Sequence, residues 1–594
     1  MRIPKHVGII PDGNRRWAQN KGMTKDKGYE NGLDPGIEAY RACRDMGVEE
    51  VTFYGFTTDN TKRPSIQTKA FTDACIKAAQ ILNDEGASLL VIGNTKSPMF
   101  PKELLPFTNR TKGKDGQIKA NLLVNYDWHW DLNTLADAEG VNKNNIQGTE
   151  PIGGLLRQFA VPSIIAMLVG ALYNIVDQFF IGRSVGELGN AATNVAFPLT
   201  ISCVALALLF GIGGAASFNL TLGGGDREKA LFYIGNAATL LFGSGVILGI
   251  VALLCLTPML HFFGSPDNVL AYAQTYTGIT ALGFPFLILT NGGGHLVRAD
   301  GSPRNAMLYN LSGALINTVL DPLFIFGFGW GIKGAAWATV IGQVVSGVLV
   351  IVYFCKFRKM YLSGGMLKPK LSYLKAIISL GLASCINQIA MAIVQIVLNN
   401  ILRYYGANSV YGSDIPIACV GVISKVNMVF MAICIGISQG SQPIWGFNYG
   451  AKKYDRVRQA YRYSVTACTV IATIFFFCFQ IFPHQIVGIF GTGSDLYFQF
   501  AERYLKIFMF MTFANGIQPV SSGFFTSIGM AKLGIVMSLT RQVIFLLPLI
   551  IIFPLFMGID GVMYAGPIAD AAAFALAIVF ARRELGKMRS AEIV

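Results

Sequence analysis

The feature that most constrains this chain is a series of about twelve apolar segments after residue 156, each about 20 residues long or longer. A helix of that length crosses the hydrocarbon core of a bilayer and satisfies its own backbone hydrogen bonds there. The expected spans are 158–181, 193–218, 230–256, 270–297, 306–328, 331–355, 374–401, 415–442, 460–483, 500–524, 533–557 and 560–582. The sequence therefore predicts an all-α membrane region with twelve transmembrane helices.

Residues 1–145 differ from the rest of the chain in charge density. They contain 20 Lys and Arg against 18 Asp and Glu, whereas the remaining residues contain 28 against 16, in a chain that is 53% hydrophobic. The stretch before the first span is polar and rich in Gly and Asn, which is typical of a linker. We therefore expect a soluble domain over 1–145, a linker over 146–157, an N-terminal membrane lobe over 158–355, an inter-lobe loop over 356–373, and a C-terminal membrane lobe with a basic tail over 374–594.

The net charge of +14 comes mainly from the loops between the apolar segments. One alternating set of loops carries about twenty Lys and Arg and the opposite set about five, and basic loops face the cytoplasm. We therefore expect a multi-pass protein in the lipid bilayer of the cell membrane, with both termini and the soluble domain in the cytoplasm. No basic stripe with interleaved aromatic residues is present, so nucleic acid is not an expected partner.

The membrane region contains an internal repeat. GIKGAAWAT at 331–339 returns as GIDGVMYAG at 558–566, an offset of 227 residues. GIGGAASFNLTLGGGDREKA at 211–230 returns as GISQGSQPIWGFNYGAKKYDRVRQA at 436–460. Each unit holds six helices, an even number, so the two lobes share one orientation and are related by an axis along the membrane normal. A substrate cavity between two six-helix lobes follows from that arrangement.

Acidic residues within apolar segments cost about 2.5–3.5 kcal/mol on insertion scales and are therefore usually functional. Asp177 lies in the first span, and Asn317 and Asp321 lie one turn apart on one face of the fifth. Thr339 follows in the next span, and Asn174 shares a face with Asp177. Carboxylate, amide and hydroxyl oxygens suit Na⁺ or a hydrogen-bonded proton. We expect a coupling site for one of these cations; the alternative is that the acids pair with intramembrane cations or cap backbone groups.

The C-terminal lobe has different polar residues in its spans. Arg541 and Asp570 lie on adjacent antiparallel spans, and a buried structural ion pair is their expected role. Gln388, Gln395 and Lys425 of this lobe, together with Asn174 of the first span, are candidates for the substrate cavity, although polar residues in helix bundles more often bridge helices.

Pro162 lies 15 residues before Asp177 on the same expected helix. Proline removes one backbone hydrogen bond and kinks a helix. Protonation of Asp177 would then bias the bend, which makes Pro162 a candidate hinge. The alternative is a static kink near a helix end.

With these residues the membrane region resembles the multidrug and toxic compound extrusion (MATE) transporters. The matching text is YNIVDQFFIG, LINTVLDPLFIFG, GAAWAT and GISQGSQPIWGFNYGA, together with the twelve-helix repeat. In the DinF-like branch of that family, the proline that matches Pro162 is the proposed bending point. The cation site of that branch consists of the residues that match Asp177, Asn317, Asp321 and Thr339. The resemblance implies an antiporter that is driven by Na⁺ or H⁺ and exports amphipathic, often cationic, drugs.

Residues 1–140 resemble cis-prenyltransferases of the undecaprenyl diphosphate synthase family. The key text is HVGIIPDGNRRWA, VEEVTFYGFTTDNTKRP and LLVNYDWHWDLN. Arg15 and Arg16 follow Asp12 where a helix is expected to begin, so they can hold a diphosphate. The resemblance implies a small α/β domain in which Asp12 handles Mg²⁺ and the departing diphosphate. The other matching active-site positions are Asn14, Arg16, Asn60 and Arg63.

The domain departs from that family in ways that bear on catalysis. The family's GH dipeptide is Gly28-Tyr29 here, the aromatic of its ENW motif is Thr61, and its NYGGR stretch is NYDWHW. The C-terminal region that binds isopentenyl diphosphate in the family is replaced by the first apolar segments. We therefore expect no complete homoallylic site, whereas an allylic-diphosphate half-site can remain.

Three functions stay open at this point. The first is a cation-coupled multidrug antiporter with a fused prenyltransferase-like domain that lacks full catalysis. The second is a transporter of isoprenoid or lipid-linked diphosphates, because fusion often joins functions of one pathway. The third is a membrane-tethered prenyltransferase that needs Mg²⁺, which the missing region makes the weakest.

Overall fold

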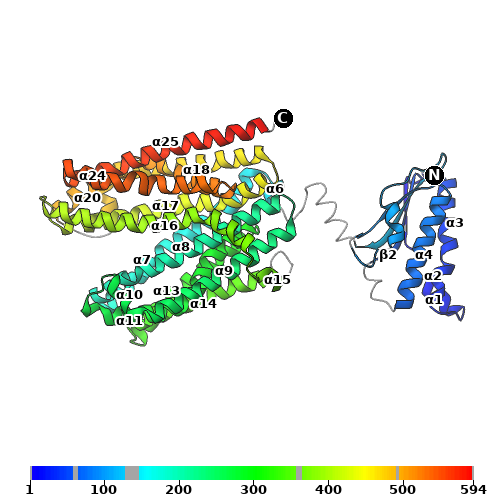
Figure 1. Ribbon diagram of the computed structural model, residues 1–594, viewed down its shortest axis with the longest axis horizontal. Helices are drawn as coiled ribbons and strands as arrows, with labels where there is room; N and C mark the ends of the chain where they lie inside the picture. The colour runs from blue at the N-terminus through cyan, green and yellow to red at the C-terminus, as the bar shows by residue number, and fades with distance from the viewer. Residues whose placement is uncertain are drawn as a thin grey trace. The chain divides into compact units, whose positions relative to one another are not determined.

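The computed structural model describes residues 3–57, 65–95, 97–127, 146–355, 364–489 and 494–591. The chain forms two compact units, Met1–Asn144 and Asn145–Val594 (Figure 1). Each unit has a hydrophobic core of its own, and the second unit has a large core in each of its two lobes.

The first unit is built on a parallel four-stranded sheet in the order β1-β2-β4-β3. Its strands are β1 (His6–Ile9), β2 (Glu50–Thr57), β3 (Ser88–Ile92) and β4 (Lys119–Tyr126). Its helices are α1 (Asn14–Asn20), α2 (Lys27–Asn31), α3 (Leu33–Asp45), α4 (Ser65–Asp84) and the 3₁₀ helix η2 (Lys102–Thr108). Parallel strands need crossover connections: α3 lies in the connection from β1 to β2, and α4 lies in the connection from β2 to β3, which is not its neighbour because β4 pairs between them. The expected small α/β domain is confirmed.

The register of the sheet places apolar side chains in a continuous core. Val7 pairs with Val51, and Phe53 pairs with Leu122. The helices cover this core with Tyr40 of α3 and Ala79 of α4, and both of these residues are fully buried. Strand β4 is buried along most of its length, whereas β2 alternates between buried and more exposed residues.

Nine helical segments of the described residues are each long and apolar enough to cross a membrane. They are α7 (Ile152–Val185), α8 (Glu187–Gly223), α9 (Arg227–Leu254), α14 (Ile332–Cys355), α16 (Leu371–Ala407), α17 (Asp414–Gly450), α18 (Tyr454–Ile481), the run of α23 (Ala531–Leu539), η6 (Thr540–Leu546) and α24 (Leu547–Met557), and α25 (Ile559–Ala591). Short helices lie between them: α6 (Ile146–Thr149), α10 (Leu256–Phe262), α15 (Gly364–Leu367) and α19 (Pro483–Gly488).

The other three expected spans are interrupted helices. The fourth is α11 (Asp267–Thr280), η3 (Ala281–Gly283) and α12 (Phe284–Ala299); the fifth is α13 (Pro303–Pro322) with the π-turn η4 (Leu323–Gly327); the tenth is α20 (Asp495–Phe508), α21 (Thr512–Asn515) and α22 (Ile517–Ser527). Pro285 and Pro322 lie at two of the breaks, where the missing backbone N–H weakens the helix. With these segments the expected twelve-helix architecture is confirmed.

The two lobes, α7–α14 and α16–α25, pack against each other through the first two long helices of each lobe. Helix α7 packs on α17, and α8 packs on α16. At the first contact a Cβ added to Gly436 would lie 2.6 Å from the Cα of Ile164, and one added to Gly440 would lie 2.6 Å from the Cα of Ala160. Glycine is required there because the helix backbones touch. The helices of the two lobes converge near α6 and diverge toward the opposite end (Figure 1).

Two of the expected connecting segments contain helical residues. Residues 146–149 form α6, and α7 begins at Ile152, so the expected linker over 146–157 is largely helical. Within the expected loop over 356–373, α15 packs on α9, and the Met366 carbonyl accepts a hydrogen bond of 3.1 Å from Asn236. These segments are ordered by tertiary hydrogen bonds that hydropathy does not reveal.

Candidate functional site

Three polar residues of the N-terminal lobe form a hydrogen-bonded cluster between neighbouring helices. Asn317 and Asp321 lie on α13, and Thr339 lies on α14, which packs against α13. The Asn317 amide donates to Asp321 Oδ1 at 3.4 Å and to Thr339 Oγ1 at 3.2 Å. Thr339 in turn donates to the Ala335 carbonyl at 2.9 Å. Asp321 is fully buried and Asn317 is 2% exposed, so the cluster lies inside the lobe.

Asp177 of α7 completes the cluster from a third helix. Helix α7 packs on α13, and the Asp177 carboxyl interacts directly with that of Asp321. The side chain of Asp177 is 8% exposed, so little solvent screens the two carboxyls. The structure therefore brings together all four residues that the sequence singled out as a cation-coupling group.

Two tyrosines belong to the same cluster and were missed in the sequence. The hydroxyls of Tyr173 and Tyr276 both interact with the hydroxyl of Thr339. Tyr173 lies one helical turn before Asp177, so the i, i+4 rule would have found it. Tyr276 lies on α11, and only the packing of helices brings it to this place. The side chain of Asn174 lies outside the described part of the structure.

The donor set of this cluster fits a proton or Na⁺. Oδ1 of Asp177, Oδ1 of Asn317 and Oδ2 of Asp321 have no hydrogen-bond partner among the described residues. Ion pairs between described residues include neither acid. Two adjacent buried carboxylates cannot both stay charged without a compensating cation or a shared proton. Hard oxygen ligands of this kind suit Na⁺, and a carboxyl pair equally suits H⁺.

The candidate hinge lies within an unbroken helix. Helix α7 runs from Ile152 to Val185 through Pro162, which is buried. The neighbouring Ser163 hydroxyl donates to the Phe159 carbonyl at 2.9 Å. Pro162 lies between Ala160 and Ile164, the two residues that touch the glycines of α17. A bend at Pro162 would therefore act directly on the contact between the lobes.

The candidate residues of the C-terminal lobe lie in two environments. Arg541 Nε and Asp570 Oδ1 form a buried ion pair of 2.5 Å, and Asn515 donates to Asp570 Oδ2 at 3.4 Å. Gln395 is exposed on α16 and donates to Asn399 at 3.0 Å. Gln388 is half-buried on α16 and Lys425 is exposed on α17. No hydrogen bond between described residues connects Gln388, Gln395 or Lys425 to the cluster of Asp177, Asn317, Asp321 and Thr339.

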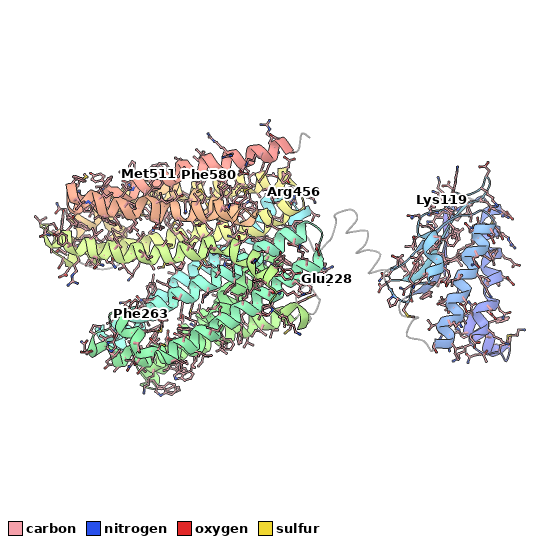
Figure 2. The ribbon with its side chains drawn as sticks, in the orientation of Figure 1. Lys119, Glu228, Phe263, Arg456, Met511 and Phe580 are labelled. Carbon is pink, nitrogen blue, oxygen red and sulfur yellow. The ribbon has the colours of Figure 1, made fainter. Side chains whose placement is uncertain are left out.

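The small helix α6 is hydrogen-bonded to both lobes at one end of the membrane unit. The fully buried Gln147 of α6 donates to the Ala299 carbonyl of the N-terminal lobe at 3.0 Å. From the C-terminal lobe, Asn448 donates to the Gln147 carbonyl at 2.9 Å, and Arg456 donates to the Glu150 carbonyl at 2.6 Å. Figure 2 shows Arg456 and Glu228 at this end of the membrane unit and Phe263 at the other. Both lobes are thus tied to α6 at the end that carries the basic loops.

The first unit contains a cavity of about 620 Å³ beside the loop between β1 and α1. Asp12 and Asn14 contribute polar groups to its wall, and most of the remaining wall is apolar, including Phe53, Phe71 and Leu122. Asp12 Oδ1 accepts a hydrogen bond of 2.7 Å from the N–H of Gly13. Gly13 has a φ of 96°, a left-handed conformation that favours glycine. This combination suits a molecule with a polar head and an apolar tail.

The arginines beside this cavity are solvent-exposed. Arg16 contacts Asp12 Oδ2 at 3.4 Å, with both side chains about four-fifths exposed, and Arg15 is also exposed. Asn60 and Arg63 lie outside the described residues. Burial raises the pKa of the Cys75 thiol, which lines the cavity, to about 12, so this cysteine is no thiolate nucleophile at neutral pH. One carboxylate, Asp12, is available to share a Mg²⁺ ion with diphosphate oxygens, which fits the sparse protein ligation of that ion.

Comparison with known proteins assigns the membrane unit to one family model. The model described as "MatE" matches residues 162–323 and 383–552. "Multidrug export protein MepA" from Staphylococcus aureus (strain MSSA476) is 26% identical over 451 residues, which cover 75% of this chain and 97% of that protein. "Crystal structure of MATE in complex with MaL6" is a structural match with a TM-score of 0.70 and 22% identity, which covers 76% of this chain and 100% of the matched chain.

A second structural match reports a defined state of its protein. It is titled "Outward-facing conformation of a multidrug resistance MATE family transporter of the MOP superfamily", with a TM-score of 0.67 and 22% identity over 75% of this chain and 99% of the matched chain. For the first unit, the family model described as "Putative undecaprenyl diphosphate synthase" matches residues 10–166. The resemblances of both parts of the chain are thereby confirmed.

Proposed function

Because this chain belongs to the MatE family of multidrug efflux transporters, we propose that it is an antiporter that exports amphipathic or cationic compounds in exchange for H⁺ or Na⁺. The observation that carries this proposal is the buried pair of carboxyls, Asp177 and Asp321, with the oxygens of Asn317 and Thr339 beside it. Acidic residues within membrane spans are rare and usually mark pathways of ions, protons or substrates.

The structure suggests how cation binding reaches the lobe interface. Asp177 and Pro162 lie on one helix, about 22 Å apart along its axis at 1.5 Å per residue. A cation between Asp177 and Asp321 would cancel their repulsion and draw α7 toward α13. The same helix touches Gly436 and Gly440 of α17 near its other end. Movement of α7 would therefore change how the two lobes pack and whether substrate is released.

We propose that the end with α6 faces the cytoplasm of a cell-membrane protein. The basic loops gather at this end, and Lys and Arg are enriched on the cytoplasmic side. The described conformation would then be closed toward the cytoplasm through α6. Both termini and the first unit would lie on the cytoplasmic side.

Transport in vesicles with an imposed gradient tests this function. The purified chain is reconstituted, and the movement of ethidium is followed by fluorescence under a pH gradient, under a Na⁺ gradient, and under neither. We expect movement of ethidium against its concentration gradient under at least one cation gradient, and collapse of that movement with an ionophore for the same cation. Ethidium movement that is equal with and without the gradients would contradict the coupling.

A second candidate activity concerns the first unit, where we propose the binding of an allylic isoprenoid diphosphate. The cavity places Asp12 and Asn14 beside apolar walls, which matches a charged head with a hydrocarbon tail. In this proposal the first unit binds an isoprenoid diphosphate. Chain elongation is a separate activity that needs Mg²⁺, and an assay with isopentenyl diphosphate tests it.

We expect the full-length protein to bind farnesyl diphosphate in the presence of Mg²⁺. Asp12→Ala is expected to weaken that binding by at least about tenfold, because a lost charge-assisted contact costs about 1.5–3 kcal/mol. Equilibrium binding of radiolabelled farnesyl diphosphate measures the effect. Asp115→Ala, in a turn that does not line the cavity, is the matched control and is expected to bind like the unmodified chain. Absence of binding to the unmodified chain would eliminate this activity without affecting the transport proposal.

A further inference from the structure

The guanidinium of Arg298 is a buried positive charge within the membrane unit. Arg298 is 3% exposed in the last turn of α12. Among the described residues its Nε has no hydrogen-bond partner, and no ion pair includes it. Within that part of the chain the one charged or titratable neighbour that interacts with it is His295, one turn earlier on the same helix. A charge in this position is strongly unfavourable unless something negative compensates it.

Arg298 lines a small polar cavity between the two lobes. The N-terminal lobe contributes Asn219 from α8 and both His295 and Arg298 from α12, and the C-terminal lobe contributes Gln439 and Gln442 from α17. Asn219, His295, Arg298 and Gln439 are each more than nine-tenths buried. The cavity therefore exists only while the two lobes are packed together at this point.

The size of the cavity limits what it can hold. The centre of a water-sized particle has only about 10 Å³ to move in, so the cavity holds a particle not much larger than a water molecule and excludes organic and multiply charged anions. A water molecule would fit but would leave the arginine charge uncompensated. A halide ion fits both the size and the charge.

The polar groups of the wall can supply the ligands of an anion. Arg298 and the His295 ring offer N–H donors. Oδ1 of Asn219 and Oε1 of Gln439 have no partner among the described residues, and a half-turn of each amide exchanges this oxygen for an NH₂ group. In that orientation residues of both lobes that line the cavity would offer N–H donors to an anion. In the opposite orientation the two amide oxygens would repel an anion. Binding of an anion would therefore favour the orientation in which the amides present their NH₂ groups.

We propose that this cavity binds one small monovalent anion, for which chloride is the probe, and that the anion holds the two lobes together in the described conformation. Because both lobes contribute ligands, separation of the lobes at this end would dismantle the site. The adjacent residue, Ala299, accepts the hydrogen bond from Gln147 of α6, so the anion site and the α6 closure lie side by side. Anion binding would stabilise the closed state without contact to the cation cluster.

Chloride binding to the full-length protein in detergent tests the proposal. Equilibrium binding of ³⁶Cl⁻ is expected to show one saturable site per chain. The melting temperature is expected to rise saturably when sodium gluconate is replaced by sodium chloride at constant Na⁺ and constant ionic strength. Arg298→Gln is expected to abolish both effects and to melt in gluconate at or above the temperature of the unmodified chain. Arg304→Gln, an exposed arginine in the first turn of α13, is the matched control and is expected to keep both effects.

A second variant keeps the test decisive if Arg298→Gln does not fold. Ala216 lines the cavity, and Ala216→Val would fill it while the arginine stays in place. We expect Ala216→Val to lose ³⁶Cl⁻ binding and the chloride-dependent rise in melting temperature. Equal melting of the unmodified chain in chloride and gluconate would show that only water occupies the cavity and would overturn the proposal. A chloride effect that persists in Arg298→Gln or Ala216→Val would place the anion elsewhere and overturn it equally.

Discussion

Replacing Asp321 with asparagine is expected to reduce gradient-driven export to the rate of vesicles without protein. Asparagine keeps the size of the side chain and a hydrogen-bonding oxygen for Asn317, but it can neither carry a negative charge nor accept a proton at neutral pH. The cation then has one carboxylate instead of two. Asp177→Asn is expected to have the same effect, and the double variant is expected to be no worse than either, because the two acids act as one site.

The melting temperature separates this role from a structural one. Because Asp321→Asn removes a buried carboxyl beside another, we expect the variant to melt at the same temperature as the unmodified chain or above it. If the acids only held helices together, both variants would melt lower. Asp267→Asn, an exposed acid on α11 of the same lobe, is the control and is expected to transport normally. Normal gradient-driven export by both Asp177→Asn and Asp321→Asn would refute the proposed coupling site.

Breaking the ion pair between Arg541 and Asp570 is expected to have the largest effect on stability. The side chains are 10% and 2% exposed, and Asp570→Asn would leave the arginine charge buried without its carboxylate. Loss of one partner of a buried pair costs about 3–5 kcal/mol. We therefore expect Asp570→Asn to lower the melting temperature in detergent by well over 5 °C or to prevent accumulation of folded protein.

A double variant shows that the loss comes from the uncompensated charge. Arg541→Met combined with Asp570→Leu replaces the pair with apolar groups, and such replacements are often neutral or stabilising. We expect it to recover most of the stability that Asp570→Asn loses. The exposed pair of Arg503 and Asp560 is the control, since surface pairs contribute about 0–1 kcal/mol. A double variant as unstable as Asp570→Asn would mean that the pair has a role beyond charge compensation.

Some of the site was predictable because it depends on local geometry. Asn317 and Asp321 share a helix face through their spacing of four, and the structure joins them with a hydrogen bond. The contact of Asp177 with Asp321 crosses 144 positions of the chain, and in the sequence only a family resemblance connected them. Tyr173 could have been predicted from the helical period, because it lies one turn from Asp177. Tyr276 could not, because only the packing of helices brings it to the cluster.

The interruptions of the fourth, fifth and tenth spans show a similar limit. Hydropathy predicts that a segment is buried in lipid, because every apolar residue contributes independently of its neighbours. It does not show where a proline or glycine breaks the helix within that segment. Helix α6 was missed for a related reason: it has only four residues and no long apolar run, and its position is determined by a hydrogen bond that Gln147 donates to the Ala299 carbonyl and by those that Asn448 and Arg456 donate to the Gln147 carbonyl.

The sequence by itself determined the twelve spans, the two-lobe repeat and the soluble α/β unit, because apolar length and repeated text are properties of the chain alone. Only the tertiary structure decided the partners. It placed Asp177 beside Asp321, paired Arg541 with Asp570, and left Arg298 buried between the lobes without a carboxylate partner among the described residues. The physical reason is that a buried charge is stabilised by whatever lies within a few ångströms, and those neighbours come from helices that are remote in sequence.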